Sequence, residues 1–412
     1  MAEEPFFGSL KSTISQLKFR VSYGQTGNAT LVNNSNAFAA YSAYPAWLSS
    51  SDTRLIGVSL SRLENPDLKW ETTTGLNFGL DFSLFNGKVD GSVEVYNNEV
   101  SDLLDTKTLN SYQEVNSVIY NVGKTQSRGF EFTLNTRNVQ TRDFQWRTIF
   151  VVSHFRTNWK ERAPGWLPSV YENSTDPLRA VYSRESDGIL QAGETKPTSQ
   201  PDLIPGQIKI KDINGFQRDA NGNPVVDANG RFIRTGAPDG RIDDADTRLM
   251  GTSDPSFMGG ITNIITYKNF SLNFDFNGLF GRRIQDPNFV AYGFSAYGIN
   301  ANGYNGLRSV KDRWTPTNPS TTSPSSFWGF SQYGTGDFFM QDAWFIRLQN
   351  VSLGYTIPGK LFKKVFTSAK VHFDAQNLFV ITPYKGIDPE TDSYTAAYPY
   401  IRTYTLGLNL NF

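Results

Sequence analysis

The sequence predicts an all-β fold, an antiparallel transmembrane β-barrel to which this chain contributes about twelve strands. Three observations support this fold class. Apolar and polar residues alternate with a period of two over segments of about ten residues or more. The polar positions carry Asn, Gly, Ser, Thr and Asp, as expected of the wet interior of a barrel. Long and short connections alternate along the chain.

The segment 72–84 shows the alternation most clearly. Its even-numbered positions are Thr, Leu or Phe, and its odd-numbered positions are Thr, Gly, Asn, Asp or Ser. Asn86 and Gly87 follow, and they favour a type I′ hairpin turn because both central residues of that turn need positive φ. The last segment, 404–412, alternates in the same way and ends on Phe412.

The same pattern predicts the other strands in chain order. The twelve segments are 17–24, 71–84, 88–97, 127–137, 143–154, 179–190, 204–212, 258–268, 270–281, 342–357, 367–381 and 398–412. Loops longer than ~12–15 residues are unusual in compact domains. Outer-membrane barrels, in contrast, combine long extracellular loops with short periplasmic turns. We therefore expect the chain to begin and end on the periplasmic side.

Composition excludes several classes of function. Lys+Arg and Asp+Glu are both 39, so the net charge is zero and gives no general attraction to nucleic acid. The absence of cysteine excludes disulfides, thiolate metal sites and cysteine nucleophiles, and two histidines cannot form a three-histidine metal site. The sequence shows neither an N-terminal signal peptide nor an apolar run of ~18 residues. No catalytic motif is present, so an enzyme is not expected.

A series of short motifs runs through most of the chain. They cover residues 17–28, 65–72, 126–131, 259–263, 376–379, 382–390 and 398–404, followed by the terminal Phe412. Each motif is weak by itself. In this order they resemble the C-terminal barrel portion of the SusC/RagA-type TonB-dependent outer-membrane transporters.

The resemblance implies that residues 1–412 are the C-terminal part of a plugged barrel of about 22 strands. It implies import of large nutrients, glycans or peptides, across the bacterial outer membrane with a SusD-like lipoprotein partner. Energy would come from TonB–ExbB–ExbD through the N-terminal part of the receptor. The plug domain, TonB box and signal peptide of the family are expected to be absent from this chain. About ten strands would then be missing, and an open sheet edge in lipid is costly, so we expect a fragment.

An Asp-rich stretch is the candidate metal site. Its proposed ligands are Asp212, Asn214, Asp239, Asp243 and Asp246. These residues can be laid on a calcium loop with Gly240 at the sharp turn, because hard cations need several oxygen ligands. Residues 215–238 interrupt this loop, so the alternative is a cluster of turns without metal. No other cofactor is predicted.

Two further groups of residues are candidates for function. Aromatic residues of the long segment 282–341 are candidates for stacking against a ligand: Tyr292, Phe294, Tyr297, Tyr304, Trp328 and Tyr333. The final strand is similar to the signal that the barrel-assembly machinery reads, carried by Tyr404, Leu406, Leu408, Leu410 and Phe412. The alternative for this strand is the terminal edge strand of a soluble sheet.

A soluble β-rich protein that binds or cleaves glycans is the alternative function. The loop aromatics and the negative mean hydropathy of −0.41 support it. It does not explain strands of about ten residues with Asn/Gly/Ser faces or the terminal Phe. A pore that works without a plug is a third hypothesis.

Overall fold

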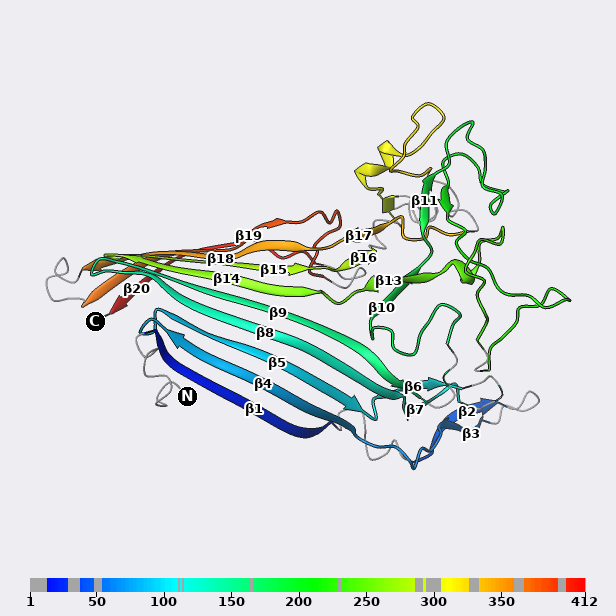
Figure 1. Cartoon of the computed structure of the whole chain (residues 1–412), viewed down its shortest axis with the longest axis horizontal. Helices are drawn as coiled ribbons and strands as arrows, with labels where there is room; N and C mark the ends of the chain where they lie inside the picture. Colours follow the sequence, from blue (N-terminus) through cyan, green and yellow to red (C-terminus); the bar gives the residue numbers. More distant parts are fainter. Residues whose placement is uncertain are drawn as a thin grey trace.

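A ten-stranded antiparallel sheet dominates the computed structural model, and its strands lie side by side in chain order (Figure 1). The structure describes residues 13–28, 38–47, 54–109, 112, 115–163, 166, 168–228, 231–285, 292–293, 305–325, 333–358, 367–391 and 398–411. The sheet, called the wall below, consists of β1 (Ile14–Asn28), β4 (Glu71–Leu84), β5 (Val89–Ser101), β8 (Gly123–Gln140), β9 (Phe144–Arg162), β14 (Phe257–Tyr267), β15 (Phe270–Phe280), β18 (Phe345–Pro358), β19 (Ser368–Ile381) and β20 (Thr403–Asn411).

The connections between wall strands alternate in length, as the sequence predicts. Short connections join β4 to β5, β8 to β9, β14 to β15 and β18 to β19, and long ones join the remaining neighbours. The connections β4–β5, β8–β9 and β14–β15 lie at the end of the wall where β1 begins and β20 ends (Figure 1). At the first of them, Asn86 and Gly87 have φ values of 57° and 75°, which confirms the positive φ expected there.

The two faces of the wall differ in chemistry. On one face Val21, Phe78, Val95 and Phe130 lie in one row across four strands, and the first three are 66%, 52% and 51% exposed. We call this the apolar face. The opposite, polar face carries Arg20, which forms ion pairs with carboxylates of the next two strands. A soluble sheet buries its apolar face, so the soluble alternative leaves this exposure unexplained.

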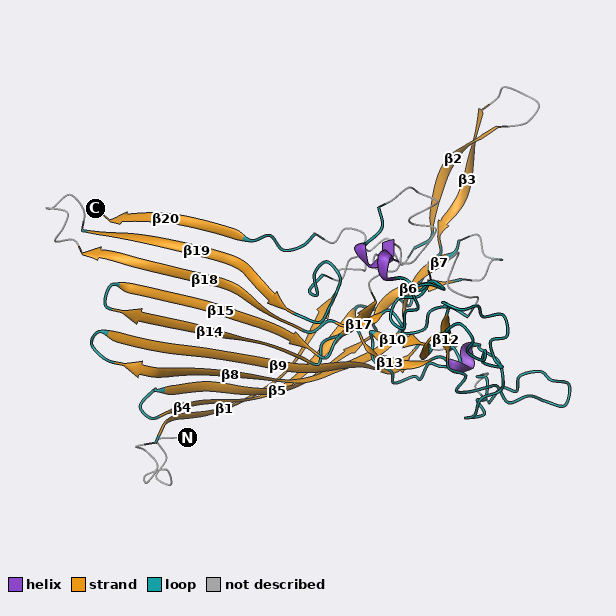
Figure 2. Ribbon diagram, turned by 90° about the horizontal axis from the view of Figure 1, so that it is seen from above, coloured by secondary structure: helices purple, strands orange, loops and turns teal. Residues whose placement is uncertain are grey.

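The wall is open within the described residues. β1 pairs with β4 and β20 pairs with β19, and the two strands lie at opposite edges of the sheet (Figure 2). Each edge therefore presents a row of backbone N–H and C=O groups without a neighbouring strand among the described residues.

Two of the predicted wall strands are wrong. Segments 179–190 and 204–212 form the short strands β10 (Ala180–Ser183), β11 (Ser186–Ile189) and β12 (Ile208–Ile210), which lie outside the wall. β10 pairs with β13 (Arg248–Thr252), and β11 pairs with β12, as separate two-stranded sheets. Their alternation has a different origin, because Ile208 and Ile210 point into a small core of the long connections.

That small core, the loop core, is formed by Ile208, Ile210 and Phe339, with Ile242 and Tyr333 packed against it. It lies among the long connections at one end of the wall (Figure 1). Further pairs there are β2 (Ala40–Trp47) with β3 (Arg54–Arg62), β6 (Leu104–Thr108) with β7 (Ser117–Asn121), and β16 (Arg283–Gln285) with β17 (Met340–Asp342). The long connections also contain the 3-10 helices η3 (Asp244–Asp246) and η5 (Arg308–Asp312). Of the described helices, none has the length and apolarity needed to cross a bilayer.

Candidate functional site

A hollow of about 560 Å³ on the polar face is the main candidate site. It extends over the middle of β9, β14, β15, β18 and β19. Its lining combines apolar residues, Ile149, Val151 and Phe276, with polar side chains and one tyrosine: Thr262, Asp275, Asn277, Gln349, Asn350, Gln376, Asn377 and Tyr400. Asn277 Oδ1 is buried and has no hydrogen-bond partner among the described residues.

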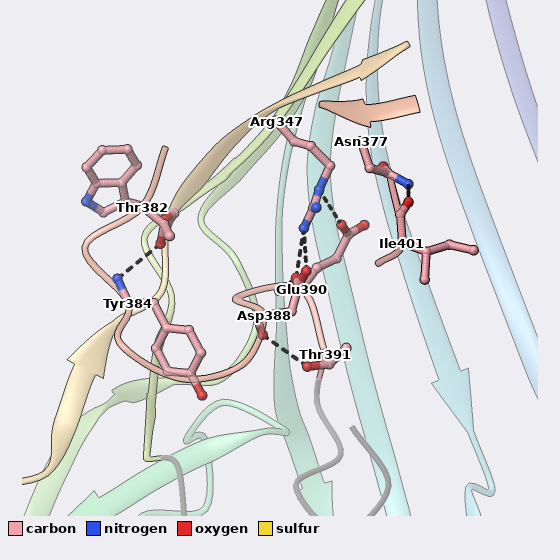
Figure 3. A network of polar contacts seen from close by, with 9 residues as sticks. Arg347, Asn377, Thr382, Tyr384, Asp388, Glu390, Thr391 and Ile401 are labelled. Carbon is pink, nitrogen blue, oxygen red and sulfur yellow. Dashed lines mark hydrogen bonds and ion pairs between the residues drawn. The ribbon is translucent and has the colours of Figure 1, made fainter. Parts of the chain in front are cut away.

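A buried ion pair lies beside this hollow (Figure 3). Arg347 of β18 donates from Nη2 to both carboxylate oxygens of Asp388, at 2.8 and 2.9 Å. The two side chains are only 5% and 6% exposed. Glu390 Oε2 lies 3.4 Å from Arg347 Nε, and the ring of Tyr400 lies 4.8 Å from the guanidinium carbon. Arg347 thus joins the wall to the connection between β19 and β20.

Local hydrogen bonds turn this connection back toward the wall. Thr382 donates to the carbonyl of Trp344 at 2.7 Å and accepts from the Tyr384 N–H at 3.1 Å (Figure 3). Asn377 sits in an irregularity of β19 with a φ of 53°, a conformation that asparagine tolerates, and its amide donates to the Ile401 carbonyl. Both ends of the connection are therefore fixed to β18 and β19.

Electrostatics explain why Asp388 rather than Glu390 is the main partner of Arg347. Asp388 also accepts from the Glu390 N–H at 2.9 Å, so its carboxylate has three hydrogen bonds. Burial raises the pKa of the Glu390 carboxyl above its usual range, although Arg347 opposes that shift. Breaking a buried pair leaves a charge without its partner, so Arg347 and Asp388 act as a latch that holds the connection.

The arrangement suits binding rather than covalent chemistry. The hollow offers amide and carboxylate groups of several strands and the ring of Tyr400, which is half exposed. Such a surface can hydrogen-bond a polar solute and contact it with an aromatic face.

The five residues of the predicted calcium loop come close together in the structure. The segment 215–238 loops out and returns, so that Asp239 and Gly240 donate their N–H groups to the Asp212 carboxylate at 3.2 and 2.8 Å. Asn214 Oδ1 accepts from the Gly236 N–H at 2.7 Å.

The remaining two candidate ligands also bind backbone groups. Asp246 is fully buried and accepts from the N–H groups of Ile213, Asn214 and Asp243, while Asp243 caps η3. Burial raises the pKa of the Asp243 carboxyl, and the nearby carboxylates add to this effect. Within the described ranges, no group of three or more His, Asp or Glu residues is arranged to hold a metal ion. Calcium binding stays a prediction.

Two of the six predicted ligand-stacking aromatics, Tyr292 and Tyr333, lie within the described residues. Tyr333 packs against the loop core, and the Tyr292 carbonyl accepts a hydrogen bond from the Leu307 N–H. Phe294, Tyr297, Tyr304 and Trp328 lie outside the described residues. Ligand stacking by these aromatics stays a prediction.

The predicted assembly signal falls on the edge strand β20. Its apolar residues Tyr404, Leu406, Leu408 and Leu410 are 60%, 77%, 59% and 38% exposed. Phe412 lies outside the described residues. Recognition by the assembly machinery stays a prediction.

Sequence reasoning did not identify the Arg347 latch. Asp388 lies in the motif 382–390 that supports the family resemblance, but a lone arginine on a polar strand face does not indicate its partner 41 residues away. The only sequence feature that pointed to the latch was the Asp-Pro-Glu segment at 388–390 in a long connection. The sequence does not show which residue these carboxylates contact.

Comparison with known proteins gives a consistent set of relatives. The family model described as "TonB dependent receptor-like, beta-barrel" matches residues 10–183. The chain is 29% identical over 446 residues to TonB-dependent receptor P3 of Formosa agariphila. It is 27% identical over 430 residues to TonB-dependent receptor SusC of Bacteroides thetaiotaomicron. Each match covers 100% of this chain and only 41% or 39% of the relative.

Solved structures share the fold. The structure described as the RagAB peptide transporter matches 97% of this chain with a TM-score of 0.72 and 24% identity. The RagAB peptide importer in its "open-open" state matches 98% with a TM-score of 0.73 and 23% identity. In both cases the chain covers 41% of the solved chain, so it spans about two fifths of the length of its neighbours.

Proposed function

Because this chain is related to the TonB-dependent receptors of the SusC/RagA type, we propose that residues 1–412 form the C-terminal part of the barrel of an outer-membrane receptor that imports large nutrients. One observation carries this proposal. The wall exposes an apolar face, lines the other face with polar groups, and places long connections at one end only. This is the arrangement of a strand wall between lipid and a wet lumen.

The substrate class in this proposal is a peptide or a glycan. A peptide is supported by the solved neighbours, which are described as a peptide transporter and a peptide importer. The hollow on the polar face supports either class, because amides, carboxylates and a tyrosine ring can hydrogen-bond peptide groups or sugar hydroxyls.

The proposed partners follow from the proposed position of the wall in the outer membrane. A SusD-like lipoprotein would cover the end with the long connections, and TonB–ExbB–ExbD would act through the N-terminal part of the receptor. The barrel-assembly machinery would insert the wall into the outer membrane. β20 supports this last role, since its outer edge presents backbone groups for strand pairing and its apolar side chains are exposed.

Growth of the host on a single nutrient tests the function. We expect deletion of the gene to abolish growth on one peptide or glycan mixture, and re-expression to restore it only when TonB is present. The receptor should copurify with a lipoprotein encoded beside it. Unchanged growth on every peptide and glycan mixture, with the protein present in the outer membrane, would refute import.

A second measurement tests the alternative soluble protein. A membrane barrel in mild detergent migrates differently in gels before and after boiling. A protein that is found in the soluble fraction and shows no such shift would contradict the proposal and support the soluble glycan-binding alternative.

A further inference from the structure

The apolar face of β9 has the height of one bilayer core. From Phe144 to His154 the strand advances ten residues, or about 34 Å at ~3.4 Å per residue. A strand tilt of roughly 40° reduces this to a height of about 26 Å, close to the ~25 Å apolar band of membrane barrels. The next residue on the same face, Arg156, therefore stands at the level of the lipid headgroups, on the side of the long connections.

Arg156 faces a second arginine at this level. Arg128 of β8 is its direct neighbour in the strand register, two residues beyond the pair of Phe130 and His154 and on the same face. Both arginines are exposed. Like charges directly opposite each other destabilise a sheet unless an anion lies between or beside them.

No carboxylate compensates this pair among the described residues. The Arg128 Nε donates only to the side-chain amide of Asn97, at 3.1 Å, and Arg156 has no ion pair there. The nearby lysines differ, because Lys124 and Lys160 contact Glu99, and Lys124 also contacts Glu161. Within this cluster the surplus positive charge therefore lies on the two arginines.

The two arginines also line a hollow of about 590 Å³, which is far larger than one phosphate group. Other polar side chains around it are Gln126, His154, Asn158, Lys160 and Thr175. The His154 ring is held on the apolar face by a hydrogen bond to the Ser256 carbonyl and by the neighbouring rings of Phe130 and Phe257. Hydrogen-bond donors thus lie directly above an apolar surface.

We propose that Arg128 and Arg156 bind a phosphate group of an outer-leaflet glycolipid of the lipopolysaccharide type. Guanidinium groups bind phosphate with charge-assisted hydrogen bonds, and the row of Val95, Phe130 and His154 below them contacts the acyl chains. The continuity of donors and apolar surface favours a lipid phosphate over free phosphate. The inference rests on the proposed placement in the outer membrane and adds a lipid site on the outside of the wall.

A binding assay with defined lipids and the full receptor, purified from its host, tests this inference. The probes are lipid A with both phosphates, lipid A without phosphate, and inorganic phosphate, added to the delipidated protein in detergent. We expect the phosphorylated lipid to bind, and Arg128→Gln/Arg156→Gln to weaken it at least about tenfold. Arg128→Lys/Arg156→Lys should retain part of the affinity because the charge remains.

The wall provides a matched control. Arg137 and Arg147 oppose each other on the same two strands, but they lie on the polar face near the short turns. Arg137→Gln/Arg147→Gln makes the same change in charge and should leave lipid binding intact. Nutrient import should be normal in the Arg128/Arg156 variant, so failure of the lipid site is distinguishable from failure of the transport function.

Three results would overturn the glycolipid site. Equal binding of lipid A with and without phosphate would exclude phosphate recognition, even if the glutamine variant failed to assemble. Equal affinity of the glutamine variant and the unsubstituted receptor would exclude these arginines. Saturable binding of inorganic phosphate that displaces the lipid probe would assign the site to free phosphate instead.

Discussion

The wall and the loop core use their apolar residues in opposite ways. In the wall, Phe78 and Leu406 are 52% and 77% exposed. In the loop core, Ile208, Ile210 and Phe339 are at most 3% exposed, as in a soluble protein. One chain therefore carries two kinds of apolar surface, exposed on the wall and buried in the loop core, as the proposed placement of the wall in lipid requires.

This difference also applies to the polar groups. Polar side chains of the wall line a hollow, and beside it the buried Asn277 Oδ1 has no hydrogen-bond partner among the described residues. Near the loop core, the buried Asp246 carboxylate accepts hydrogen bonds from three backbone N–H groups, so its own hydrogen-bonding capacity is used within the chain. The wall offers its polar groups to a solute, whereas the long connections use theirs to fix their own fold.

The largest expected effect comes from breaking the latch between these regions. Arg347→Ala removes the partner of the buried Asp388 carboxylate and should cost about 3–5 kcal/mol. Hydrogen exchange of residues 382–391 should then rise strongly, while exchange in β4 and β5 stays slow. Exchange in 382–391 equal to that of the unsubstituted protein would contradict the latch, and Asp388→Asn provides the reciprocal variant.

The next effect tests whether the loop core folds as a unit. Ile208→Ala removes buried apolar volume and should cost about 2–5 kcal/mol. Proteolysis within 168–256 should accelerate, whereas the gel shift on boiling should remain. Loss of that gel shift would show that the wall depends on the loop core and would remove the distinction between the two regions.

A charge on the apolar face tests the lipid around the wall. Leu134 lies near mid-height on the apolar face of β8, and its neighbour Thr133 lies on the polar face. Leu134→Arg should destabilise the wall by about 2–4 kcal/mol in bilayers, and Thr133→Arg by much less. Unfolding in lipid vesicles measures both, and equal effects would place both faces in the same solvent.

The smallest effect is the response of the long connections to acid. Lys209 lies 2.5 Å from Glu194 and holds the pKa of that carboxyl below its ordinary value of 4.5. A lowered folded pKa gives stability that is present above 4.5 and lost as the pH falls further. Glu194→Gln should cost less than about 1 kcal/mol at pH 7, because the carboxylate is partly exposed.

Proteolysis of the loop region between pH 7 and 3 checks this prediction. The unsubstituted protein should lose more stability on acidification than the Glu194→Gln variant. Identical pH profiles would show that other carboxylates dominate the acid response. Asp243 is not one of them, because a raised folded pKa favours the folded state as the pH falls.

The same comparison explains what could be predicted from the sequence. Alternation predicts a two-faced strand, and it located all ten wall strands. It could not distinguish the wall from β12, because Ile208 and Ile210 also alternate with polar neighbours while facing the loop core. The latch was not predictable, since it depends on how the connection after β19 returns to β18.

The segment inserted between Asn214 and Asp239 has a consequence for how such receptors diversify. Its two ends are tied together, because Thr235 donates its N–H to the Gly215 carbonyl and Gly236 donates to Asn214 Oδ1. The segment between these ends lies outside the wall strands, and Arg231 and Arg234 attach it to backbone carbonyls of the long connection. In the proposed outer-membrane receptor this segment would lie on the extracellular side, where a change in its length leaves the strands of the wall unaltered.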